Sequence, residues 1–279
     1  MAVKRHKWHP KTGNEVYVDQ NSYCNALQDV KLEAGRKKDE TLDEQDRKQL
    51  RSMCGQLLWA STQTRPDAAF DACQVSNYGS GATVKSLMEA NKAVKKLRAD
   101  NLRIVYPCLG DVKLMKIIVY ADGSHAALPS GASQGANIVF VSGNGRSAPI
   151  SWESKKLERV TKSPLATEIS AVADAADHGH LVASMVKELY HLEKLPIIEV
   201  YTDSNSLKEH LETTHIINDP RLRVDIARLR EMKEIGEVVV KWVPSELQLA
   251  DCMTKRGSSS SLLCQVLASG ALPEHHTEQ

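Results

Sequence analysis

The chain has 279 residues, of which 42% are hydrophobic and 25% charged, and its net charge is +1. This composition is close to the average for soluble globular proteins, so a disordered, collagenous or coiled-coil chain is excluded. No apolar run approaches the roughly 20 residues that a membrane span needs, and residues 1–10 lack the apolar core of a secretory signal. We therefore expect an intracellular protein, cytoplasmic or nuclear, with no membrane partner and one large or two modest domains.

The first part of the chain has the periodicity of helices. Between residues 41 and 77, apolar residues from Leu50 to Leu58 recur at spacings of three and four, and Pro66 interrupts the pattern, which predicts two helices with a break. Residues 84–99 place an apolar stripe opposite Lys and Arg, which predicts a third, amphipathic helix. Residues 101–111 are predicted to be a linker, so residues 1–111 form a mainly helical first segment.

The pattern changes at Lys116. Runs rich in β-branched residues at 117–120, 136–142 and 148–152 are separated by turn residues and predict three antiparallel strands. A long helix follows at 164–189, with Pro164 in its first turn. The remaining predicted elements are a strand at 197–202, helices at 204–211 and 221–235, a strand at 238–243, and helical pieces from Ser245, with a flexible turn at 257–261. Residues 112–279 are therefore predicted to form a mixed α/β sheet covered on its faces.

Four acidic residues lie where an isolated carboxylate is unfavourable. Asp122 and Asp203 end two predicted strands, Glu168 lies near the start of the long helix, and Asp251 begins the last helical region. Each alone is explained by a turn, a helix cap or the helix dipole. Together, in this order, they predict a site at the carboxyl ends of the strands, where converging acids hold a hard cation such as Mg²⁺.

The segments that carry these acids resemble a known family. Residues 116–255 resemble the ribonuclease H domain of copia-type retrotransposon Pol polyproteins, through the motifs Tyr120-Ala-Asp-Gly-Ser, Ile150-Ser-Trp-Glu-Ser-Lys-Lys, Ala166-Thr-Glu-Ile-Ser-Ala, Tyr201-Thr-Asp-Ser-Asn and Gln248-Leu-Ala-Asp-Cys-Met-Thr-Lys. Upstream, Gly55-Gln-Leu-Leu-Trp and Thr64-Arg-Pro-Asp resemble the segment that follows the reverse transcriptase palm in the same polyproteins.

The resemblance implies an α/β, ribonuclease H-like fold: a mixed five-stranded sheet with helices on both faces, preceded by a small, mainly helical segment. Residues 1–111 would be a connection- or thumb-like remnant with a linker, and residues 112–279 the ribonuclease H domain. The implied activity is metal-dependent endonucleolytic hydrolysis of the RNA strand of RNA–DNA hybrids. Asp122, Glu168, Asp203 and Asp251 would be the catalytic residues and would hold two Mg²⁺ ions, with Mn²⁺ as a substitute.

Candidate nucleic-acid contacts lie beside these acids. Gly123, Ser124 and Asn205 are adjacent to the metal ligands and could contact 2′-hydroxyl groups. Lys155 and Lys156 belong to a basic run at 154–162, which is either a solvated turn or a site for backbone phosphate. The expected partners are an RNA–DNA hybrid and the polymerase part of a larger polyprotein, in which case the protein would be particle-associated.

The sequence also departs from the family. The palm with its aspartate pair is absent, so we expect no polymerase activity. Where many relatives have Lys-His-Ile-Asp, this chain has Leu222-Arg-Val-Asp, and we interpret Asp225 as a surface or capping residue. His178, His180 and His215 are interpreted as ordinary surface or helix histidines. The alternative function is a catalytically inactive or host-adopted fragment that serves as a nucleic-acid or protein binding module.

Overall fold

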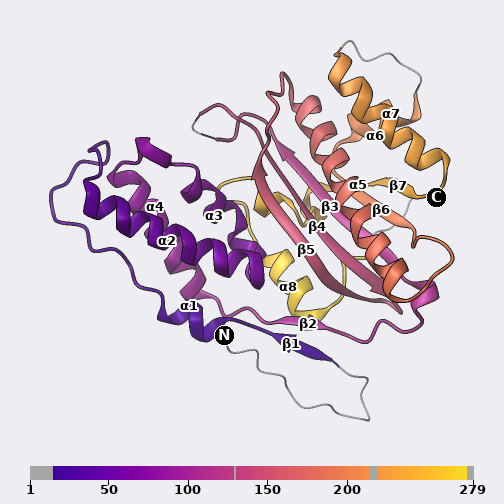
Figure 1. Ribbon diagram of the computed structural model, residues 1–279, viewed down its shortest axis with the longest axis horizontal. Helices are drawn as coiled ribbons and strands as arrows, with labels where there is room; N and C mark the ends of the chain where they lie inside the picture. Colours follow the sequence, from indigo (N-terminus) through magenta and orange to yellow (C-terminus); the bar gives the residue numbers. More distant parts are fainter. Residues whose placement is uncertain (1–14, 129, 214–218, 275–279) are drawn as a thin grey trace.

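The computed structural model describes residues 15–128, 130–213 and 219–274. His215 and residues 1–10, both discussed above, lie outside these ranges. A central sheet separates a group of helices formed by the first hundred residues from a second group formed by the later part of the chain (Figure 1). No helix in the described ranges has the length and apolarity that a transmembrane span needs.

The central sheet has five strands in the order β5-β4-β3-β6-β7. Strands β3 (Lys116–Ser124), β4 (Gln134–Gly143) and β5 (Arg146–Lys156) are antiparallel. Strands β6 (Ile198–Thr202) and β7 (Val238–Trp242) run parallel to β3. The tight turn between β4 and β5 uses Asn144 and Gly145, both with positive φ, as a two-residue hairpin requires. The predicted mixed five-stranded sheet is confirmed.

One face of the sheet is covered by α5 (Pro164–Leu189), α6 (Asn205–Glu212) and α7 (Pro220–Glu234). Helix α5 begins where the sequence predicts, because Ser163 caps it and Pro164 occupies its first turn. Gly179 lets α5 lie close to the sheet: a Cβ there would be 2.9 Å from a methyl group of Val119 and of Ile198. These contacts fix the helix that carries Glu168.

The opposite face is covered by α8 (Ser261–Ser269) and by β2 (Ile104–Tyr106). Tyr120 and Phe140 of the sheet are buried there together with Leu263 and Leu267 of α8. Helices therefore lie on both faces, as predicted. The structure differs from the sequence prediction at residues 101–111, because part of this predicted linker is β2, which pairs antiparallel with β1 (Val16–Val18).

The first segment contains α1 (Asn21–Ala26), α2 (Glu44–Gln63), α3 (Ala69–Ser76) and α4 (Val84–Ala99). Asp43 caps α2, and Pro66 begins a short 3₁₀ turn, η1 (Pro66–Ala68), that separates α2 from α3. The apolar stripe of α4 is buried against α2 in a core of this segment's own. The segment also touches the sheet, because Trp152 Nε1 of β5 donates a hydrogen bond to the carbonyl of Ser61, at 2.7 Å.

Four further 3₁₀ turns complete the described elements. They are η2 (Gly79–Gly81), η3 (Val112–Leu114), η4 (Ser245–Leu247) and η5 (Asp251–Met253). Turns η4 and η5 follow β7 and lie between the sheet and α8 in the chain. Asp251, the first residue of η5, is paired with Lys255, which lies two residues after this turn and close to Asp122 of β3. The division of the chain at residue 111 stays a prediction.

Candidate metal centre

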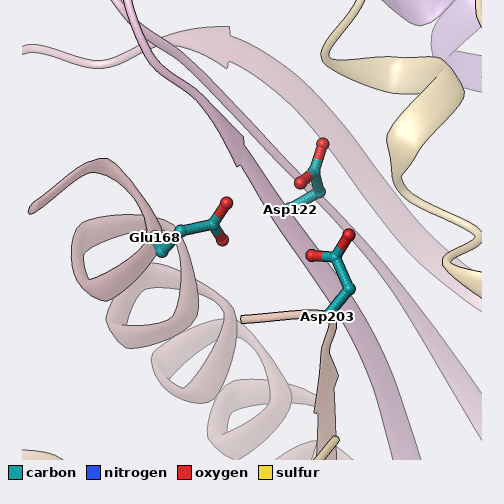
Figure 2. A group of neighbouring side chains, drawn as sticks. All are labelled: Asp122, Glu168 and Asp203. Atoms are coloured by element: carbon teal, nitrogen blue, oxygen red, sulfur yellow. The ribbon is translucent and has the colours of Figure 1, made fainter. Parts of the chain in front are cut away.

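Three of the four predicted acids gather at one end of the sheet. Asp122 lies in β3, Glu168 near the start of α5, and Asp203 directly after β6. One carboxylate oxygen of each lies within 4.8 Å of the other two, and the side chains point toward one another (Figure 2). The acids meet because β3 and β6 are parallel neighbours, whose carboxyl ends share one edge. The predicted convergence of these three residues is confirmed.

Close packing sets the distance between β3 and α5 at the site. A Cβ on Gly123 would lie 2.9 Å from the carbonyl oxygen of Thr167, so only glycine allows this approach without a shift of the helix. Thr167 precedes Glu168, and the contact therefore places Glu168 beside Asp122. Gly123 itself is buried, and this close packing explains why a glycine is needed at the position. Ser124, the last residue of β3, is half-buried.

Burial dominates the electrostatics of two of the acids. Asp122 is 1% exposed, and this burial raises its pKa, although Lys255 and the Thr254 hydroxyl act in the opposite direction. For Glu168, burial and then the neighbouring charges of Asp122 and Asp203 raise the pKa to about 9. Glu168 Oε2 is buried and has no hydrogen-bond partner among the described residues. Without a cation, the site therefore favours a proton on Glu168.

The fourth predicted ligand, Asp251, lies beside this group but is not one of the three mutually close carboxylates in the described part of the chain. Its Oδ1 accepts a hydrogen bond from Lys255 Nζ, which also lies 3.7 Å from Asp122 Oδ2. A role for Asp251 as a metal ligand stays a prediction. Sequence reasoning missed Lys255, although it ends the quoted motif and follows Asp251 by four residues, the spacing of a helical ion pair.

The remaining predicted contacts lie around the site and along β5. Asn205 is exposed at the start of α6. Lys155 Nζ forms ion pairs with Glu153 at 3.0 Å and with Asp174 at 3.1 Å, so its charge is already neutralised by acidic partners. Lys156 is exposed, and together with Trp152 and Leu58 both lysines line a cavity of about 380 Å³ between β5 and the first segment. Their contacts with nucleic acid stay predictions.

Asp225, interpreted as a surface or capping residue, and His178, interpreted as a surface or helix histidine, both have specific partners. Asp225 lies inside α7 with a side chain only 14% exposed, and it forms an ion pair with Arg159 at 3.2 Å. His178 uses both ring nitrogens, at 2.7 Å from Asn137 Oδ1 and 2.8 Å from Ser151 Oγ. Burial lowers the pKa of His178. His178 therefore connects α5 to β4 and β5, whereas Asp225 connects α7 to Arg159 in the segment between β5 and α5.

The raised pKa of Glu168 predicts how metal-free stability depends on pH. Because the folded-state pKa of about 9 exceeds the ordinary 4.5, the folded protein holds this proton more tightly than the unfolded chain does. The free energy of unfolding should therefore fall as pH rises from about 5 to 9. Glu168→Gln should remove this loss, which at pH 7 is at most about 3 kcal/mol. Urea unfolding in EDTA at pH 5 and pH 8 measures the free energy of unfolding of both proteins. If the difference in this free energy between Glu168→Gln and the parent is the same at both pH values, the prediction is wrong.

Comparison with known proteins gives a distant relative by sequence. The chain is 24% identical over 223 residues to the retrovirus-related Pol polyprotein from transposon RE1 of Arabidopsis thaliana, and the aligned part covers 75% of this chain but 14% of that protein. No family model matches the chain. The chain thus has a distant similarity to a copia-type Pol polyprotein and spans a small part of its length.

Solved structures with similar arrangements include ribonucleases H. Ribonuclease H1 of Halobacterium salinarum matches with a TM-score of 0.35 and 19% identity, over 48% of this chain and 89% of that one. LC11 ribonuclease H1 in complex with an RNA/DNA hybrid gives a TM-score of 0.34 and 16% identity, over 48% and 88%. The foamy viral protease–reverse transcriptase in complex with an RNA/DNA hybrid matches with a TM-score of 0.42 and 16% identity. The match covers 76% of this chain and 26% of that one. The arrangement that the resemblance to ribonuclease H implies is present, with three antiparallel strands followed by two parallel ones and helices on both faces.

Proposed function

We propose that this chain is a metal-dependent ribonuclease H that hydrolyses the RNA strand of RNA–DNA hybrids, as part of a copia-type Pol polyprotein. The observation that supports this proposal is the meeting of Asp122, Glu168 and Asp203 within 4.8 Å at the carboxyl ends of β3 and β6. Hydrolysis adds water across a phosphodiester of the RNA strand and leaves a 3′-hydroxyl and a 5′-phosphate. No side-chain nucleophile is needed for this reaction.

The donor atoms of the site suit a divalent ion such as Mg²⁺. Carboxylate oxygens are the ligands that hard cations prefer, and Mn²⁺ accepts the same set. The buried Glu168 Oε2, which has no hydrogen-bond partner among the described residues, requires either a proton or a cation. Asp122, Glu168 and Asp203 would hold the metal, with Asp251 as the proposed fourth ligand. When bound, the metal supplies an activated water and offsets charge on the leaving oxygen.

The protein's own residues have three tasks in this proposal. Strands β3 and β6 hold Asp122 and Asp203 in a fixed arrangement, and Ser245 Oγ steadies Asp203 Oδ2 with a hydrogen bond of 2.7 Å. Glu168 gives up its proton when the cation arrives, so metal binding should release protons. Ser124 and Asn205, next to the acids, are the groups proposed to contact the 2′-hydroxyls that distinguish RNA from DNA.

Lys156 is proposed to contact the phosphate backbone along the cavity beside β5. Lys156→Ala should weaken hybrid binding and make it less dependent on salt, with a slope lower by roughly one unit, while cleavage at saturating substrate stays nearly unchanged. Lys155→Ala should have the smaller effect, because Glu153 and Asp174 already neutralise Lys155. Binding curves at several salt concentrations measure this, with Lys233→Ala on α7 as the control. Identical salt slopes for Lys156→Ala and the parent would contradict the prediction.

The proposed activity is tested with purified protein and a hybrid labelled on the RNA strand. In Mg²⁺ we expect cleavage of the RNA strand to products with 3′-hydroxyl and 5′-phosphate ends, and no cleavage in EDTA. Single-stranded RNA and double-stranded DNA should remain intact. Tight hybrid binding without cleavage in either Mg²⁺ or Mn²⁺ would overturn the proposal and support a binding module instead.

A further inference from the structure

The ammonium group of Lys255 lies among the carboxylates of the candidate metal centre. Its Nζ donates a hydrogen bond to Asp251 Oδ1 and lies 3.7 Å from Asp122 Oδ2. The charge of Lys255 also interacts with Asp203 and Glu168, so it affects all four predicted acids. Asp122 is 1% exposed, and its interaction with Lys255 is therefore much less screened by solvent than that of a surface ion pair.

The backbone that carries Lys255 is firmly attached to the sheet. Gln248 Nε2 donates to the carbonyl of Ala121 in β3, at 3.0 Å. Thr254 is fully buried, and its hydroxyl donates to Asp122 Oδ2. The Lys255 amide donates to the carbonyl of Asp251, at 3.2 Å. The Cα of Lys255 is thus fixed beside the site, while its side chain is 43% exposed and has room to turn toward solvent.

We propose that Lys255 is a built-in cation of this site, whose ammonium holds the position between Asp122 and Asp251 until a divalent ion replaces it. This inference rests on the proposed function. An ion shared by Asp122 and Asp251 would need the space that Nζ occupies and would be repelled by its charge. Without substrate, the protein should therefore bind one divalent ion, through Asp122, Glu168 and Asp203. A second ion should bind only when Lys255 turns away, for which a substrate phosphate offers an alternative partner.

The test counts bound Mn²⁺ without substrate. Calorimetric titration and electron paramagnetic resonance of free Mn²⁺ are compared for the parent, Lys255→Met and Lys116→Met. Methionine keeps the length of the apolar stem and removes the charge. Lys116 is the matched control, because it is 51% exposed and pairs with the buried Glu199 at 2.9 Å, in another part of the sheet. We expect one ion in the parent and in Lys116→Met, and two in Lys255→Met, with the second bound at least about tenfold more tightly than any second ion in the parent.

Thermal unfolding in EDTA gives a second readout that needs no metal. Lys255→Met should lower the melting temperature, because Asp122 and Asp251 lose their shared counter-ion, and Asp251→Asn added to Lys255→Met should restore part of the loss. Equal Mn²⁺ stoichiometry and affinity in all three proteins, or no Mn²⁺ binding by any of them, would overturn the proposal. Hybrid cleavage by the parent is measured separately. If the parent cleaves the hybrid but Lys255→Met binds no more Mn²⁺ than the parent, only the role of Lys255 is rejected. If Lys255→Met binds a second Mn²⁺ ion but the parent does not cleave the hybrid, only the ribonuclease activity is rejected.

Discussion

Asp203→Asn should reduce hybrid cleavage by roughly 10²–10⁴-fold, because loss of one metal-binding carboxylate removes several kcal/mol of transition-state stabilisation. The same substitution should leave the metal-free protein as stable as the parent or more stable. Asparagine retains an oxygen that can accept the hydrogen bond from Ser245, and removal of the charge relieves repulsion toward Glu168 and Asp122. Single-turnover cleavage rates in saturating Mg²⁺ and melting temperatures in EDTA measure the two effects.

Asp177→Asn is the control for this experiment. Asp177 is a half-exposed aspartate of α5 that pairs with Arg228 at 2.9 Å, away from the cluster, so its substitution should preserve cleavage. If Asp203→Asn is instead strongly destabilised in EDTA, Asp203 is a structural hydrogen-bond acceptor. Cleavage by Asp203→Asn at the parent's rate would remove Asp203 from the catalytic site.

Arg65→Ala should cost about 3–5 kcal/mol of stability, the largest effect that we expect in the first segment. Arg65 is fully buried, forms two hydrogen bonds with Asp67 at 2.9 and 2.8 Å, and donates to the carbonyls of Leu97 and Asp100 at the end of α4. Its removal leaves the Asp67 carboxylate buried without its partner, and also leaves two carbonyls without a donor. Urea unfolding at neutral pH measures the loss.

Two further variants distinguish the effect of the uncompensated buried charge from that of the lost carbonyl contacts. Arg51→Ala removes an exposed arginine of α2 whose pair with Glu44 is long, at 3.3 Å, and should change stability by less than about 1 kcal/mol. The double substitution Arg65→Met with Asp67→Leu should recover much of the loss, because a buried pair replaced as a whole leaves no uncompensated charge. A double variant less stable than Arg65→Ala would show that the carbonyl contacts matter more than the buried charge.

Local signals in the sequence were sufficient for most elements around the site. The β-branched runs predict the strands, and Pro164 in the first turn predicts where α5 begins. The convergence of Asp122 and Asp203 follows from their positions at the ends of two parallel strands. Asp122 lies two residues before the end of β3 rather than at its end, because Gly123 and Ser124 continue the pairing with β4.

Contacts between distant parts of the chain could not be predicted in this way. Strands β1 and β2 have three residues each and pair across most of the first segment, so neither has a periodicity that distinguishes it from a loop. The burial of Arg65 depends on the end of α4, and the position of Lys255 depends on the hydrogen bonds that Gln248 and Thr254, on either side of η5, make with β3. Charge alone would place both side chains at the surface.

The position of α8 has a consequence for the synthesis of the protein. Strands β3 to β7 are complete in the nascent chain before α8 is made, yet the cover of the face that contains Tyr120 and Phe140 is completed only when Leu263 and Leu267 of α8 reach it. In that interval the sheet exposes aromatic and aliphatic side chains to water and to other nascent chains. A chain that pauses between β7 and α8 would therefore have a paired sheet that is still prone to aggregation.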